Sequence, residues 1–223
     1  MEPRLTEIND NEVLLYLGYR GGEIPQEMQR DIARCQETVL NTARPRIVWR
    51  EFDLCPDGTL SGTDFRPAGK DVQALLQDCK KAVLLGATLG TEIEALLQRA
   101  QVQNMADAVI LDCCASSAIE NVCDHFCEDL QQAVAPKYLT DRFSPGYGDL
   151  PFSQQPDFCR ILDLGRRIGV TLSPGGIMIP QKSVTAILGI ADRPQTKRFR
   201  GCAHCNLFQT CTLRKENRTC GKF

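Results

Sequence analysis

The chain has 223 residues, of which 43% are apolar and 24% are charged. These values are typical of a globular protein with a buried core, and they exclude a disordered chain. No stretch approaches the ~20 apolar residues needed to cross a bilayer, and the polar start is unlike a signal peptide. We therefore expect a cytoplasmic protein that is not inserted in a membrane.

Charge divides the chain into two parts. Residues 1–192 carry 18 basic and 27 acidic side chains, a net charge of −9, whereas residues 193–223 carry eight basic and one acidic, a net charge of +7. A nucleic-acid-binding domain would instead present a basic stripe on a folded face. The distribution predicts a body over 1–192 and a basic tail over 193–223, and it argues against a nucleic-acid partner.

The first half of the chain mixes helical and strand-like patterns. The apolar spacing predicts a short helix over 12–17, an amphipathic helix over 25–43, a strand over 47–54, a helix over 72–79 and a buried strand over 82–85. Thr91 followed by Glu94 has the spacing of a capping box, which predicts that the next helix begins at Thr91.

Residues 105–134 contain neither proline nor glycine and carry apolar side chains at helical intervals, so we expect one long central helix. Its small residues at 115–118 would either pack against a neighbouring helix or line a groove. After it, residues 142–151 should be irregular, a helix should start near Pro156, and strands are expected at 170–172, 177–179 and 184–190. Because no βαβ pattern repeats, the fold class is α+β with a mixed or antiparallel twisted sheet.

Several kinds of active site are missing from the sequence. There is no GxxxxGK[ST] phosphate loop, no GxGxxG after a predicted strand and no GxSxG element. The chain has only two histidines, His125 and His204, which leaves almost no material for a hydrolase triad. His125 lies between Cys123 and Cys127. These residues would either reach a metal, or the cysteines would face the packed side of the helix.

Twelve cysteines without a secretory signal should be reduced, so their spacing matters more than their number. Cys35, Cys55, Cys79 and Cys159 sit among apolar residues, where cysteine usually behaves as a small buried hydrophobe. The last four follow the pattern Cys-x2-Cys-x5-Cys-x8-Cys, and they are Cys202, Cys205, Cys211 and Cys220.

Four thiolates on a short segment can hold a tetrahedral zinc ion or a 4Fe–4S cluster. Paired CxxC motifs would favour zinc, whereas the wider spacing here favours the cluster. The CxxxCxxC run of radical S-adenosylmethionine enzymes is absent. We therefore expect a small metal-binding or iron–sulfur tail, with zinc as the alternative.

Residues 142–147, RFSPGY, are the most specific local pattern in the body. Arginine offers a planar fork of donors for a carboxylate, glycine lets a ligand approach the backbone, proline fixes the loop and tyrosine supplies an aromatic wall. These properties suit a ligand clamp, and they suit equally a tight structural turn with a surface arginine.

The same loop, with Pro151 after it, resembles the RxxPGYxxxP loop of the activation domain of cobalamin-dependent methionine synthase. The resemblance covers most of residues 8–192. It extends to four further stretches, which are EVLLYLGY at 12–19, ATLG at 87–90, VTLSP at 170–174 and PQKSV at 180–184.

The resemblance implies that the chain binds S-adenosylmethionine and delivers its methyl group to the cobalamin of a partner. Arg142 would bind the ligand carboxylate, and the backbone around Ser144 and Gly146 would hold its amino-acid and adenosine parts. Tyr147 would be the residue nearest the chemistry, approaching both ligand and corrin. Glu120 would supply an acidic contact, with a solvated glutamate on a helix face as the alternative.

The leading hypothesis is a separate reactivation partner for a cobalamin-dependent methionine synthase or related corrinoid protein, served by an electron donor. The tail cluster would pass the electron needed to return cob(II)alamin to methylcobalamin. The alternative is a scaffold protein that binds a corrinoid protein or S-adenosylmethionine without turnover and carries a structural zinc. Iron with inorganic sulfide in anaerobically purified protein would support the first hypothesis, and zinc the second.

Overall fold

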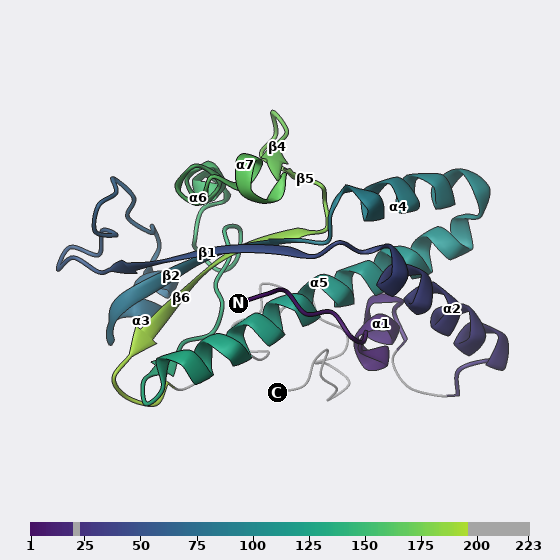
Figure 1. Ribbon diagram of the computed structural model, residues 1–223, viewed down its shortest axis with the longest axis horizontal. Coiled ribbons are helices and arrows are strands. Elements are labelled where there is room, and N and C mark those ends of the chain that lie inside the picture. The colour runs from purple at the N-terminus through teal and green to yellow at the C-terminus, as the bar shows by residue number, and fades with distance from the viewer. Residues whose placement is uncertain (20–22, 196–223) are drawn as a thin grey trace. The chain divides into compact units, whose positions relative to one another are not determined.

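The structure is a computed structural model that describes residues 1–19 and 23–195 (Figure 1). Its elements are α1 (Asp10–Tyr16), α2 (Gln26–Thr42), β1 (Arg46–Asp53), α3 (Lys70–Leu76), β2 (Cys79–Thr88), α4 (Thr91–Gln103), α5 (Met105–Val134), β3 (Tyr138–Leu139), the 3-10 helix η1 (Phe152–Gln154), α6 (Gln155–Leu162), α7 (Leu164–Ile168), β4 (Thr171–Leu172), β5 (Met178–Ile179) and β6 (Ser183–Ala191). The predicted α+β class and the long helix are confirmed, and α5 has the predicted bounds.

The main sheet is antiparallel and has the strand order β1-β2-β6-β3, while β4 and β5 form a separate pair. The burial of each strand depends on its place in this sheet. Strand β1 has a single neighbour in this sheet and only two buried residues, Val48 and Phe52, whereas β2 and β6 are buried along most of their length. Strands that are covered on both faces favour continuous apolar sequence, which is why AVLL and AILGIA stand out in this chain.

The described residues divide into two compact units. The first unit consists of residues 1–48, 86–130 and 164–184, and the second of residues 49–85, 131–163 and the described residues from 185 onward. None of the described helices is long and apolar enough to cross a membrane. The predicted tail over 193–223 lies almost entirely outside the described residues, so that boundary stays a prediction.

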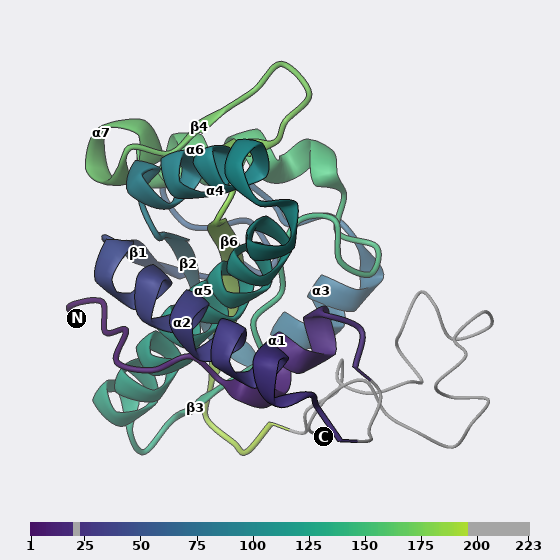
Figure 2. The ribbon, with the colours of Figure 1, turned by 90° about the vertical axis from the view of Figure 1, so that its right-hand side faces the viewer.

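In the first unit, α1 and α2 lie beside α5 (Figure 2). Ser117 of α5 is fully buried and its hydroxyl donates to Glu12 of α1 over 2.8 Å. Arg34 of α2 donates to both carboxylate oxygens of Asp107, at 2.8 and 3.0 Å, and this contact lowers the Asp107 pKa. The small residues at 115–118 are therefore explained by helix packing, because all but Ser116 are buried.

Two stretches that carry the family resemblance meet in the same unit. The backbone N–H of Leu89 donates to the carbonyl of Lys182 over 3.0 Å, and the hydroxyls of Thr88 and Ser183 lie 2.9 Å apart. The Lys182 ammonium, whose side chain is 14% exposed, reaches Asp112 of α5 over 2.8 Å. The ATLG and PQKSV stretches thus hold the end of β2, the start of β6 and α5 together.

Helix α4 begins at Thr91, as predicted, but the predicted capping box is wrong. The N-cap of α4 is Gly90, with a φ of +91° and no side-chain cap, and Glu94 instead accepts from the backbone N–H of Gln181 over 2.9 Å. The Glu94 carboxylate is therefore hydrogen-bonded to a residue distant in the sequence and does not cap the start of its own helix. Strand β3 was not predicted, because two residues are too few for a periodic signal.

In the second unit, Gly189 of β6 leaves room for the thiol of Cys79, the first residue of the neighbouring strand β2. A Cβ atom at Gly189 would lie 2.3 Å from the Cys79 sulfur and 3.0 Å from Leu76. The backbone at Gly189 has no positive φ, so the requirement for glycine is one of space. Burial also raises the pKa of Cys79 to about 11, as expected for a packed thiol.

We predict that Gly189→Ala destabilises the protein by ~1–3 kcal/mol through overpacking. In urea unfolding, Gly189→Ala combined with Cys79→Ala should cost less than the sum of the two single changes, because truncating the thiol removes the closest clash. Gly175→Ala is the matched control, since its nearest neighbour would lie 3.9 Å away. Additive effects of the first two changes would contradict this account.

Candidate functional site

The candidate site begins at an irregularity in the pairing of β6. Leu139 pairs with Ile190, and the N–H of Thr140 donates to the carbonyl of Gly189 over 3.0 Å. Further along the chain Phe143 pairs with Ile187. The N–H of Phe143 donates to the carbonyl of Ile187 over 2.9 Å, and the N–H of Ile187 donates to the carbonyl of Phe143 over 2.8 Å. The register therefore shifts by one residue in the interval between these pairs.

Asp141 and Arg142 fill that interval and together oppose the single residue Leu188. This arrangement is a β-bulge, which bends a strand and redirects its side chains. Arg142 is half-buried and sits directly before the buried Phe143, which is paired with β6. The candidate carboxylate-binding residue is thus carried by a backbone that is hydrogen-bonded to the sheet on both sides.

The PGY turn follows at once. The N–H of Tyr147 donates to the carbonyl of Ser144 over 3.0 Å, which closes a four-residue turn. Pro145 occupies its second position, and Gly146 occupies its third with a φ of +91°. This is the pattern of a type II turn, in which proline presets the first torsion and glycine supplies the positive one.

A second turn locks the first. The N–H of Leu150 donates to the carbonyl of Tyr147 over 3.0 Å, and the N–H of Gly146 donates to the carbonyl of Leu150 over 2.9 Å. Leu150 is 1% exposed and therefore fixes this end of the loop in the core. Because the Gly146 N–H is used within the loop, the expected ligand contact at Gly146 would have to come from another part of its backbone.

Asp149 joins the loop to α3. Its two carboxylate oxygens accept from the backbone N–H groups of Lys70 and Asp71, at 2.6 and 3.1 Å. The N-cap of α3 is Gly69, which has no side chain to satisfy these donors, and a Cβ there would collide with Asp149. The loop therefore supplies the cap of a helix that precedes it by many residues.

The exposed part of the loop is aromatic. Tyr147 is 70% exposed, and Phe152, which is 47% exposed, lies beside Gly146. Pro145 and Leu150 point the other way and are buried. Large apolar side chains held outward by a rigid turn are suited to contacting another molecule.

The remaining predicted site residues fall elsewhere. Arg142, Ser144, Gly146 and Tyr147 are brought together in the loop of the second unit, whereas Glu120 is a half-buried residue of α5 in the first unit. Cys202, Cys205, Cys211 and Cys220 lie outside the described residues, so the metal-binding tail stays a prediction.

Within residues 1–19 and 23–195, no three side chains of histidine, cysteine, aspartate or glutamate are grouped to hold a metal ion. Cys123 is fully buried, and His125 lies with Nδ1 3.3 Å from the carbonyl oxygen of Arg4. The burial of Cys123 fits the packed-helix interpretation. Burial likewise raises the pKa of Cys35 to about 11 and of Cys114 to about 12, which keeps both thiols protonated at neutral pH.

Together, the antiparallel four-stranded sheet and the long helix α5 define an α+β fold. Among solved structures, the chain is similar to the crystal structure of the MetH reactivation domain bound to AdoHcy. The match has a TM-score of 0.63 at 14% sequence identity and covers 85% of this chain and 75% of the other. The likeness establishes the fold. No protein-family model and no curated protein matches the sequence.

We predict that Asp149→Ala loosens both the loop and the start of α3. Losing a helix cap typically costs ~1 kcal/mol, and two donors lose their acceptor here. Amide hydrogen exchange at Lys70 and Asp71 should accelerate, while Asp149→Asn, which keeps one acceptor oxygen, should show a smaller effect. Unchanged exchange at both amides in Asp149→Ala would show that this carboxylate does not hold the loop.

Proposed function

We propose that the chain binds S-adenosylmethionine at the loop of residues 142–150 and supports reductive remethylation of cob(II)alamin on a partner cobalamin-dependent methionine synthase or related corrinoid protein. The observation that carries the proposal is Arg142 on a β-bulge, followed directly by a rigid PGY turn. The fold supports it, because the similar reactivation domain was solved with AdoHcy, the product left when S-adenosylmethionine loses its methyl group.

Arg142 would recognise the carboxylate of the ligand's methionine part. A guanidinium presents two parallel N–H donors that match the two oxygens of a carboxylate, and such bidentate pairs fix orientation as well as contributing affinity. The bulge matters because the donors must be aimed before the ligand arrives. Ser144 and Gly146 would contribute backbone contacts to the same ligand.

Tyr147 would lie between the ligand and the corrin of the partner. Its 70% exposure and the double turn beneath it leave the ring held outward and ready to contact a second molecule. In the proposed reaction, cob(II)alamin gains one electron, the methyl group leaves the sulfonium of S-adenosylmethionine, and S-adenosylhomocysteine and methylcobalamin result. The chain's own residues would bind the methyl donor and orient it toward the cobalt.

The electron would come from a donor through the cysteine-rich tail. Of the two metals that Cys202, Cys205, Cys211 and Cys220 suit, we propose a 4Fe–4S cluster, because only a redox centre serves this step. Iron with inorganic sulfide in anaerobically purified protein would support it. One zinc per chain would instead favour the scaffold alternative, in which the tail is structural.

Arg142→Ala should weaken S-adenosylmethionine binding by more than tenfold, because removing one partner of a charge-assisted pair costs about 2–5 kcal/mol. Isothermal calorimetry on the full chain measures this. Arg167→Ala, at an exposed arginine of α7, is the control and should leave the affinity unchanged. If a folded Arg142→Ala protein binds as tightly as the wild type, the loop is not the ligand site.

Tyr147→Ala should slow methylation of a partner's cob(II)alamin more than it weakens S-adenosylmethionine binding. The measurement is methylation under a strong chemical reductant, so that electron delivery does not limit the rate. Tyr138→Ala removes a tyrosine that is 39% exposed on β3 and is the matched control. Equal losses of binding and methylation would reduce Tyr147 to a part of the ligand pocket.

A further inference from the structure

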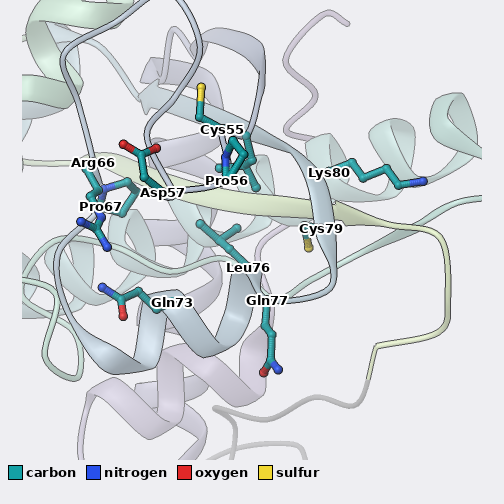
Figure 3. Close-up of a pocket in the computed structure, with 12 residues that line it drawn as sticks. Cys55, Pro56, Asp57, Arg66, Pro67, Gln73, Leu76, Gln77, Cys79 and Lys80 are labelled. Carbon is teal, nitrogen blue, oxygen red and sulfur yellow. The ribbon is translucent and has the colours of Figure 1, made fainter.

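A cavity of about 440 Å³ lies in the second unit, between the connection that follows β1 and helix α3 (Figure 3). This volume falls in the range of ~300–1,000 Å³ typical of small-molecule sites. Residues 54–58, Arg66 and Pro67 line one side, and Gln73, Leu76 and Gln77 line the other. None of these residues belongs to the loop of residues 142–150.

The wall formed by the connection is held in place by its own hydrogen bonds. The Asp57 carboxylate accepts from the N–H and the hydroxyl of Thr59, both over 3.0 Å, and the N–H of Gly58 donates to Cys55 over 2.8 Å. Further along, the Gln154 side chain accepts from the N–H of Ala68 and donates to the carbonyl of Arg66, at 2.8 and 2.9 Å. The cavity is thus preformed rather than a gap between loose segments.

Two exposed side chains of opposite charge, Asp57 and Arg66, line the same wall of the cavity (Figure 3). The hydrogen bonds from Thr59 and the charge of Arg66 lower the Asp57 pKa. Nevertheless, within the described part of the chain the Arg66 guanidinium makes no hydrogen bond and no ion pair within 4.0 Å. The two groups are close enough to interact through space and still have capacity for a ligand.

The other side of the cavity offers hydrogen bonds and an apolar floor. Gln73 and Gln77 lie one helical turn apart, and among residues 1–19 and 23–195 neither side-chain amide has a hydrogen-bond partner. Leu54, Leu76 and Pro67 supply apolar surface beneath them, and Leu76 and Pro67 are buried. Lys80, also at the rim, is already paired with Asp192 over 2.7 Å.

We propose that this cavity binds a free zwitterionic α-amino acid with an apolar side chain, its carboxylate on Arg66, its ammonium on Asp57 and its side chain against Leu54, Leu76 and Pro67. An anion alone would meet the repulsion of Asp57, and a cation alone that of Arg66. A ligand carrying both charges on one carbon satisfies both groups at once. The amides of Gln73 and Gln77 can serve the remaining carboxylate and ammonium positions.

The test is calorimetry on the full chain with L-leucine and L-methionine as probes. Both should bind, and Arg66→Ala and Asp57→Asn should each weaken binding by at least about tenfold. Arg167→Ala is the matched control, because Arg167 is exposed and does not line the cavity. Circular dichroism confirms folding, and Arg66→Gln, which keeps length without charge, replaces Arg66→Ala should that protein not fold.

Chemical variants of the probe provide the second arm. N-acetyl-L-leucine lacks the ammonium and L-leucinamide lacks the carboxylate, so both should fail to bind. Equal binding of either analogue, or no binding of the amino acids at millimolar concentration, would overturn the proposal. S-adenosylmethionine affinity should be unchanged in Arg66→Ala, so failure at this cavity and failure at the loop are separate results.

Discussion

One extra residue in the pairing of β6 determines where Arg142 lies. Before the bulge in the chain, the N–H of Thr140 is hydrogen-bonded to the carbonyl of Gly189. After it, Phe143 and Ile187 each donate a backbone hydrogen bond to the other. The backbone between them must leave the sheet and return, which places Asp141 and Arg142 opposite the single residue Leu188. A regular ladder would have moved every following side chain to the opposite face, because side chains alternate along a strand. The position of the whole PGY loop therefore depends on this irregularity.

Two hydrogen-bonded turns and the side chain of Asp149 make the loop rigid. Pro145 and Gly146 set the torsions of the first turn, the Gly146 and Leu150 backbones close the second, and Asp149 fastens it to α3. Rigidity is costly to build into a surface loop, since ordering each residue opposes folding by ~1–2 kcal/mol. A loop held by this many contacts would lose less entropy on binding a ligand than a flexible loop would. The same helix α3 that Asp149 caps also lines the cavity around Arg66.

The sequence predicts secondary structure well where the apolar periodicity extends over many residues. It predicts poorly those features that depend on contacts between segments distant in the sequence. Helix α5 was predicted to the residue because thirty positions without proline or glycine leave little ambiguity. The α+β class and the strands β4, β5 and β6 were also found. The capping box at Thr91 failed because Glu94 is engaged by Gln181, a residue far along the chain. The bulge at Arg142, the role of Asp149 and the cavity beside Arg66 carry no local signal, since each depends on segments that are distant in sequence.

The proposed function depends on binding of the methyl donor at the loop of residues 142–150. Titration of isotope-labelled full-length protein with S-adenosylhomocysteine, followed by nuclear magnetic resonance, tests it most directly. If the donor binds there, the amides of residues 142–150 will show the largest saturable shifts, while those of residues 54–58 along the Arg66 cavity stay in place. Saturable binding that leaves the amides of 142–150 unmoved would contradict it.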